Sequence, residues 1–452
     1  MHESRDGQNS KPLVRRNFTL GVINGALWMF SRALYEPETI LPAFAVALMG
    51  DNPIWVALLV SVVNAGWFWP PLVIAPALAT RQRRHIYYQV SAGFRIAMLV
   101  LIWLAVKDLA GSRPALAFWT IALCYLIYTS GGGVGLVPFM SVVTDSIPAN
   151  RRGQFFGLRY LFGGLLAFVA GFWVKWVLSA DSGMGFPDNY ALVFGVAAVV
   201  GAISLLVFCF ALEPAHKVES RQFPLGKLVL RGLRRAWREP DFRRLIATRV
   251  YYSAGTGLVF PFLVPFAYRY LSMTEAMVGI LVAVRQLCYS LANIPWSTMS
   301  DRRGNVPVFV ISGLITLGSV LLAVATALLP AVPLGTLWGL HFDLRLAVLV
   351  LAFAASGAGN AGQVVAHNSY LLEFTPERTR PVYMGTYYMV LLPLAFVPVP
   401  AALLIGTGGH YLPAFGIGAL VFLLMLLLEA RLNPLRGPSA RGRAASSRLT
   451  SP

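Results

Sequence analysis

The sequence is short of charged residues and of cysteine. Only 12% of its 452 residues are charged, whereas an ordinary soluble protein has about 25%. A soluble fold of this length would need far more polar surface, so the composition argues against one. The three cysteines, Cys124, Cys209 and Cys288, lie inside apolar runs and have neither metal-site nor disulfide spacing. We expect them to be small core residues, and we expect no bound metal.

Motifs of soluble enzymes are missing as well. The chain has no P-loop, so ATP is not expected to be the direct energy source. The most similar string is the glycine run at 131–135, but it lies in an apolar run and no Lys-Ser or Lys-Thr follows it. We therefore expect no catalytic residues and no cofactor, and a protein that is not an enzyme.

Long apolar runs dominate the sequence instead, since 57% of the residues are hydrophobic. Runs of roughly 20 residues cross a bilayer as helices, because backbone groups in lipid must pair within their own segment. The alternating segments of about 10 residues that a membrane barrel needs are absent. We predict an all-α integral membrane protein with twelve transmembrane helices, at 17–47, 53–78, 85–107, 114–145, 154–178, 189–212, 243–271, 275–299, 306–331, 345–373, 382–406 and 411–431.

The basic residues that give the chain its net charge of +18 are unevenly distributed along the sequence. Most of them lie on one side of the predicted membrane, in the two ends of the chain and in loops at 81–84, 151–152, 217–244, 302–303 and 378–380. The other side receives only Lys107, Arg113, Lys175, Arg269 and Arg345. This positive-inside pattern predicts cytoplasmic termini and fits a bacterial inner membrane. It gives no reason to expect nucleic-acid binding.

Features of the first half recur in the second half at nearly one offset. Acid, proline, arginine, aromatic and glycine positions at 145–157 return in register 228 residues later, at 373–385. Such duplicated halves enclose a site near the midplane of the bilayer and rock about it. We predict a cytoplasmic head, a six-helix bundle, a basic amphipathic linker, a second six-helix bundle and a disordered tail, at 1–16, 17–212, 213–242, 243–432 and 433–452.

Here the sequence resembles the major facilitator superfamily, over nearly its whole length. The family's loop signature, Gly-x-x-x-Asp-Arg-x-Gly-Arg/Lys, is matched best by 301–305, whereas the first copy has Thr80 at the acid position and Arg83 at the glycine position. The resemblance implies a cytoplasmic latch, in which this loop docks on the acidic end of the fourth or tenth helix and helps hold the outward-facing state. The matching residues are Asp145, Arg151, Arg152, Asp301, Arg302, Gly304, Glu373 and Arg380.

Two other features of the family are missing. The fourth span has no arginine of the kind that accompanies proton coupling in many members, and the fifth lacks the glycine-proline motif of many antiporters. Neither coupling nor export is therefore assigned by motif.

Arg285 and the adjacent Gln286 are the strongest candidates for a substrate site. Arg285 lies near the middle of the eighth span, too far from either surface to snorkel, and burying its charge in hydrocarbon is costly. It must pair with an acid or face a wet cavity, and a guanidinium suits a carboxylate or phosphate. Because eighth helices line the cavity in the family that the chain resembles, we expect substrate binding. A purely structural ion pair is the alternative.

Charged residues also gather in the outer half of the first span. Arg32 and Glu36 are four residues apart and Glu38 follows, while Pro37, whose counterpart is Pro261, predicts a kink. Two interpretations are open: a gate or proton site, and a local salt bridge.

Further polar residues lie in three spans. Asn360, Gln363 and His367 share one face of the tenth span, where they indicate either substrate contact or hydrogen bonds between helices. His367 could also carry a proton, because histidine titrates near neutral pH. Asn24 and Tyr252 are additional substrate candidates, whereas Arg159 and Arg249 lie near predicted cytoplasmic ends, where we expect gate pairs or interface anchors.

Together these features predict a secondary active transporter that moves a small organic solute by alternating access. If transport is coupled to protons, Glu36, Glu38 or His367 carries the proton. The alternative is a membrane receptor or assembly partner with the same fold and no transport. The expected partners are a small-molecule substrate and the lipid bilayer, and a monomer suffices for this architecture.

Overall fold

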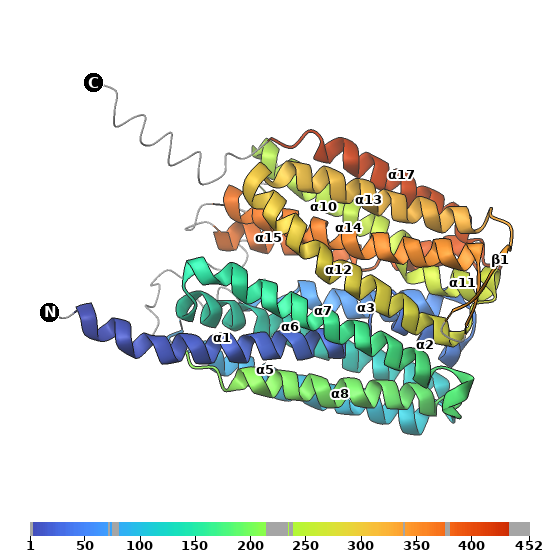
Figure 1. Cartoon of the computed structure of the whole chain (residues 1–452), viewed down its shortest axis with the longest axis horizontal. Coiled ribbons are helices and arrows are strands. Elements are labelled where there is room, and N and C mark those ends of the chain that lie inside the picture. Colours follow the sequence, from blue (N-terminus) through green and yellow to red (C-terminus); the bar gives the residue numbers. More distant parts are fainter. Residues whose placement is uncertain are drawn as a thin grey trace.

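The structure, a computed structural model, describes residues 3–70, 73–74, 81–213, 234, 238–337, 340–375 and 380–433. Nearly all of these residues are helical, and the helices run side by side along the long axis of the molecule (Figure 1). The predicted linker and tail lie almost entirely outside the described residues, so their amphipathic and disordered character stays a prediction.

Each half is a bundle of helices with short connections. The first half contains α1 (Glu3–Ala33), α2 (Ile40–Met49), α3 (Pro53–Phe68), α5 (His85–Leu104), η1 (Ala105–Leu109), α6 (Pro114–Ser146), α7 (Ala149–Val177), η2 (Ala180–Ser182) and α8 (Asp188–Cys209). The second half contains α10 (Pro240–Val259), η3 (Phe260–Phe262), α11 (Leu263–Leu271), α12 (Glu275–Arg303), α13 (Asn305–Thr326), α14 (Leu344–Phe374), α15 (Arg380–Leu394), α16 (Pro398–Ile405) and α17 (Tyr411–Glu429). An antiparallel hairpin, β1 (Pro333–Leu337) and β2 (Leu340–Asp343), connects α13 to α14.

The predicted twelve-helix fold is confirmed. Among the described residues, ten helical segments are long and apolar enough to cross a membrane. The first span is made of α1 and α2, and the second contains α3, which completes the twelve.

Three spans are broken near their middle, each beside a proline. Pro37 lies between α1 and α2, Pro261 lies in η3 between α10 and α11, and Pro398 begins α16 after the break that follows α15. Proline lacks the N–H that a continuous helix needs, so it favours such breaks. Pro37 and Pro261 occupy equivalent places in the two halves, as the repeat predicts.

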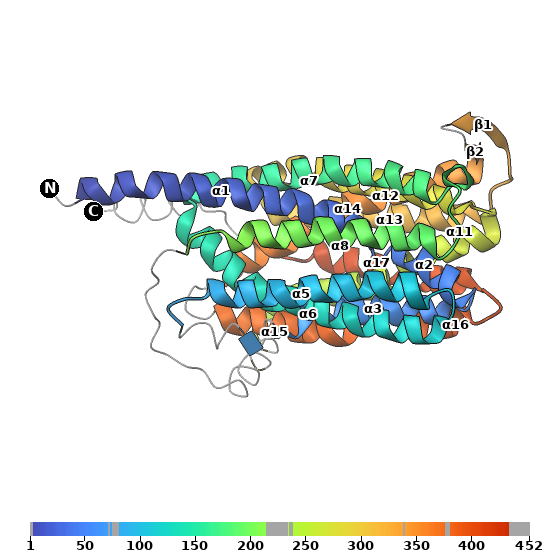
Figure 2. The same ribbon diagram turned by 90° about the horizontal axis from the view of Figure 1, so that it is seen from below.

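Both ends of the described chain lie at one end of the bundle. We call this the terminal end, and the opposite end, which carries β1 and β2, the hairpin end (Figures 1 and 2). The side-chain hydrogen bond from Asn433 to Asp241, of 2.7 Å, shows that the chain's last described residue meets the start of α10.

The two halves share a hydrophobic core on the hairpin side. This core joins Leu41 and Ala45 of α2 to Phe262 and Val278 of the second half, all of them fully buried. The buried residues of each other cluster come from one half, although Phe68 of the first half packs against the second-half cluster. Among the described residues, the buried core therefore holds the halves together on the hairpin side.

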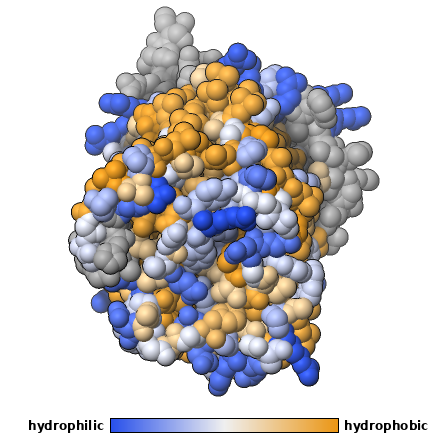
Figure 3. All heavy atoms as spheres, turned by 90° about the vertical axis from the view of Figure 1, so that its right-hand side faces the viewer, coloured by the Kyte–Doolittle hydropathy of each residue, from blue (hydrophilic) through white to orange (hydrophobic). Residues whose placement is uncertain are grey.

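The outward faces of the helices expose large apolar side chains, as a lipid-facing surface requires. Examples from both halves are Phe94, Trp119, Leu123, Val199 and Leu403, each more than half exposed. Hydrophilic side chains gather at the hairpin end instead, where Figure 3 looks along the bundle axis.

Candidate functional site

A cavity of about 380 Å³ lies between the two halves. Its walls come from the α1–α2 break, α3 and α7 on one side and from α10, α12, α14, α15 and α16 on the other. Pro37, Pro261 and Pro398, the prolines of the three broken spans, all line it. The breaks in the helices thus occur where the chain borders a polar space, the setting in which irregular backbone is tolerated within a membrane.

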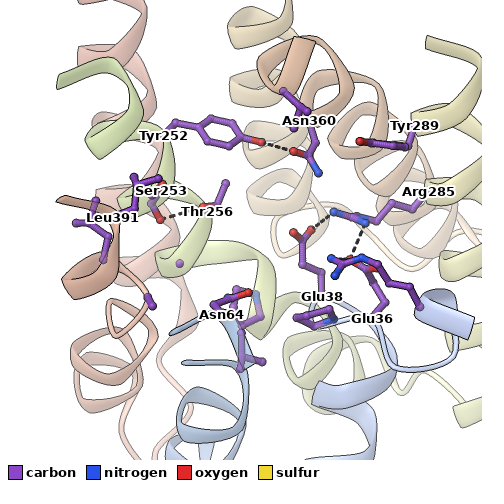
Figure 4. A pocket seen from close by; sticks show the side chains of 18 of the residues that line it. Glu36, Glu38, Asn64, Tyr252, Ser253, Thr256, Arg285, Tyr289, Asn360 and Leu391 are labelled. Carbon is purple, nitrogen blue, oxygen red and sulfur yellow. Dashed lines mark hydrogen bonds and ion pairs between the residues drawn. The ribbon is translucent and has the colours of Figure 1, made fainter. Parts of the chain in front are cut away.

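An ion-pair cluster in the cavity wall joins the two halves (Figure 4). Arg285 of α12 contacts Glu36 Oε1 through Nη1 at 3.1 Å and Glu38 Oε2 through Nη2 at 2.6 Å. Gln286 donates a 3.1 Å hydrogen bond to Glu36 Oε2, and Arg32 Nη2 lies 3.6 Å from Glu36 Oε1. Arg285 and Glu36 are each only 3% exposed. The structure thus brings together five residues that the sequence singled out.

The break after α1 explains why both acids reach one guanidinium. Successive helical residues are rotated by about 100°, so residues two apart in a helix do not face the same way. Glu36 and Glu38 lie outside helical geometry, and both carboxylates point toward Arg285 (Figure 4). The backbone stays satisfied, because Thr39 N and Leu41 N both donate to Glu36 O at 3.2 Å.

One face of α10 forms much of the opposite wall. Arg249, Tyr252, Ser253 and Thr256 follow the helical spacing i, i+3, i+4 and i+7, and all of them line the cavity. The Tyr252 hydroxyl donates a 2.8 Å hydrogen bond to Asn360 Oδ1 (Figure 4). The Arg249 guanidinium carbon lies 5.3 Å from the centre of the Tyr252 ring.

The sequence analysis missed several of these wall residues. The sequence predicts a gate pair or an interface anchor at Arg249, because it lies near the end of an apolar run, yet the structure places it on the cavity. Ser253, Thr256 and Asn64 line the cavity as well. The polar stripe on α10 was a usable signal, since its four members repeat at helical spacing in a span.

Three predicted site residues lie outside the cavity lining. Gln363 is fully buried and donates to Phe309 O at 3.1 Å and to Glu429 Oε1 at 2.8 Å. His367 Nδ1 lies 2.8 Å from Gln363 O, and Asn24 donates to Ser204 O at 2.8 Å. The contacts of Gln363 join α14 to α13 and α17, as the alternative interpretation of hydrogen bonding between helices expects, whereas this contact of His367 lies within α14.

Two of the predicted latch residues, Arg152 and Asp145, make hydrogen bonds within the first half. Arg152 donates to the carbonyls of Thr144 at 2.7 Å and Ile147 at 3.0 Å, at the end of α6. Asp145 accepts from Ser141 at 3.2 Å. Arg151, Asp301 and Arg302 are exposed and have no ion pair in the described part of the chain.

The remaining latch positions are only partly visible. Gly304 ends α12 at a φ of +81°, a backbone conformation that favours glycine. Glu373 is half-buried, while Thr80 and the side chain of Arg380 lie outside the described residues. The latch therefore stays a prediction.

Comparison with known proteins agrees with the resemblance. The family model of the Major Facilitator Superfamily matches residues 245–451. Among curated proteins, no relative matches the chain.

Solved transporters of low sequence identity share the fold over more than nine-tenths of this chain. The human organic anion transporter MFSD10 (TETRAN) is 17% identical with a TM-score of 0.64, over 93% of this chain and 100% of that one. The nucleoside transporter NupG is 13% identical with a TM-score of 0.67, over 92% and 99%. The D-xylose-proton symporter is 11% identical with a TM-score of 0.66, over 94% and 98%. The matched family and these structures are transporters, and nothing among them supports the receptor alternative.

Proposed function

We propose that this chain is a secondary transporter of the major facilitator superfamily and that it carries a small organic solute through its central cavity by alternating access. The observation that carries the proposal is the position of the cavity between two halves that share a cluster of buried apolar residues on the hairpin side. Rocking of the halves would open the hairpin side and close the terminal side. The halves are assigned to 17–212 and 243–432.

The cluster of Glu36, Glu38 and Arg285 acts as the gate in this proposal. It links the halves in the state seen here, and Arg32 supports it from α1. Protonation of either carboxylate would remove a charge that Arg285 requires and would weaken the link. Proton coupling through Glu36 or Glu38 is the finer proposal, with His367 as a less direct candidate because it lies outside the lining.

Solute contacts are assigned to polar groups that reach the cavity. Gln286, Tyr252 and Asn360 supply donors and acceptors, and Arg285 becomes available to the solute when its link to the acids opens. Gln363 and Asn24 would act only by positioning helices. The distribution of basic residues supports an inner-membrane location with both termini in the cytoplasm.

The structural neighbours do not decide the substrate. One is named for organic anions, one for nucleosides and one for D-xylose with protons. At identities of 17% or less, the similarity extends to the fold alone, so the substrate must be inferred from this chain's own residues.

Accessibility from both membrane faces tests alternating access. Ser253→Cys is placed in a protein whose three native cysteines are replaced by serine, and a membrane-impermeant maleimide is added to right-side-out or inside-out vesicles. We expect labelling from both sides, because Ser253 lines the cavity. Ser319→Cys is the matched control and should react from neither side, since Ser319 is fully buried. Labelling of Ser253→Cys from one side only would favour a receptor.

A further inference from the structure

We infer that Arg249 is the anchor for an organic anion, so that the solute carries one negative group attached to an apolar body. The inference rests on the proposed function and names the substrate class of the same cavity. It assigns to Arg249 a role distinct from that of Arg285, which the acids already occupy.

The charges that line the cavity do not balance. Its arginines are Arg32, Arg249 and Arg285, and its acids are Glu36 and Glu38. The formal charge of this lining is therefore +1. A surplus positive charge in a partly desolvated cavity favours an anion, because its field is screened less there than in water.

The surplus charge belongs to Arg249. Arg285 contacts both acids and Arg32 contacts Glu36, whereas Arg249 has no ion pair and donates no hydrogen bond in the described part of the chain. The ionisable side chains near enough to feel its charge include His367, Tyr387 and Tyr388, and none of these is a carboxylate. A guanidinium has five donors arranged to hold a carboxylate with two hydrogen bonds.

Other arginines inside the bundle show that this situation is particular to Arg249. Arg95 donates to the Tyr128 hydroxyl at 3.2 Å, and Arg159 donates to Gly21 O and to Asn24 Oδ1. Their donors are used within the first half, although neither has an acid partner among the described residues. Arg249 lies over the Tyr252 ring, as Arg95 lies over the Tyr128 ring, but among the described residues no group accepts a hydrogen bond from its guanidinium, which leaves its donors for a ligand.

The rest of the lining specifies the body of the solute. Apolar side chains from several helices face the cavity: Trp28, Val60, Phe68, Leu391 and Leu394. They suit a hydrocarbon or aromatic group, while Ser253 and Thr256 offer hydroxyls on the same face of α10 as Arg249. A volume of about 380 Å³ is within the range of small-molecule sites. The expected ligand is a compact amphiphilic anion.

Binding to the purified full-length protein tests the inference, with 4-phenylbutyrate as probe and 4-phenylbutyramide as its uncharged analogue. Affinities follow from the shift in thermal unfolding with ligand concentration in an uncharged detergent. We expect the carboxylate to bind and the amide to bind about 10- to 100-fold more weakly, and Arg249→Gln should weaken carboxylate binding by a similar factor. Arg249→Lys should retain part of it.

The matched control is Arg244→Gln, on the same helix. Arg244 pairs with Asp241 at 3.4 Å and does not line the cavity, so this variant should bind the carboxylate as the wild type does. An anionic lysolipid is tested in parallel. Tighter, Arg249-dependent binding of the lysolipid would support the anion site and identify a lipid as the source of the anion.

Two results would overturn the inference: no stabilisation by either anion, or equal stabilisation of wild type and Arg249→Gln. These failures can be told apart from failure of the transport proposal. Two-sided labelling of Ser253→Cys without anion binding keeps transport and removes the anion anchor. Anion binding with one-sided labelling keeps the anchor and removes transport.

Discussion

Replacing Glu36 by glutamine should open the hairpin side of the protein. Glu36 accepts contacts from Arg285, Gln286 and Arg32, and Arg285 and Gln286 lie in the opposite half. A hydrogen bond to a charged group contributes on the order of 1.5–3 kcal/mol, and Arg285 keeps Glu38 as its second partner. At about 1.4 kcal/mol per tenfold change, the closed state should lose about 10- to 100-fold in population relative to the open state.

The assay measures the labelling rate of a single cysteine in the seam, which is the buried core that joins the two halves on the hairpin side. Ala45 of α2 is fully buried in the core that joins the halves, so Ala45→Cys should react slowly with a maleimide added from the hairpin side. We expect Glu36→Gln to raise this rate by about 10- to 100-fold, the same factor as the population change.

Asp343→Asn is the matched control for this substitution. Asp343 pairs with Arg345 at 3.0 Å within the second half, so its loss removes an ion pair of the same chemistry without touching the seam. An unchanged labelling rate in folded Glu36→Gln would refute the role of the cluster as a link between the halves. An equal rise in Asp343→Asn would show that the effect is general loss of stability.

Two further substitutions test packing away from the gate. Gln363→Leu should lower the free energy of unfolding by about 1–3 kcal/mol, because it leaves the buried Glu429 carboxyl without its hydrogen-bond donor. Chemical denaturation measures this loss. The double variant Gln363→Leu, Glu429→Leu should recover part of it. Gly279→Ala should speed labelling of the seam, because a Cβ there would collide with the α7 backbone at Gly171, whereas a Cβ at Gly318 meets open space. Equal labelling rates in Gly279→Ala and Gly318→Ala would contradict close packing of α7 on α12.

The site was predictable where charge stood out against an apolar background. Arg285, Glu36, Glu38 and Arg32 were recognisable because ionisable residues are rare inside spans and need partners there. Their pairing was not predictable, since Arg285 and Glu36 are 249 residues apart and meet only through the docking of two bundles.

Helix rotation explains the residues that the structure places elsewhere. Gln363 and His367 share a face with Asn360 in the sequence, yet only Asn360 reaches the cavity. Residues of α13 and α17 bury the other two. Phe309 O and Glu429 Oε1 accept hydrogen bonds from Gln363, and the Phe309 ring contacts the ring of His367. Arg249 shows the reverse case, in which a residue near the end of a span faces the cavity.

The sequence alone predicted the membrane class, the twelve spans, the duplication and the kink at Pro37 with its counterpart at Pro261, whereas the break at Pro398 emerged only in the structure. These depend on local hydrophobicity and on backbone chemistry, which each segment carries by itself. Tertiary structure decided which acids meet Arg285, which face of each helix borders the cavity, and that Arg249 has no ion pair among the described residues. Such features depend on how helices rotate and dock, and the free energies of those choices come from contacts between residues far apart in the chain.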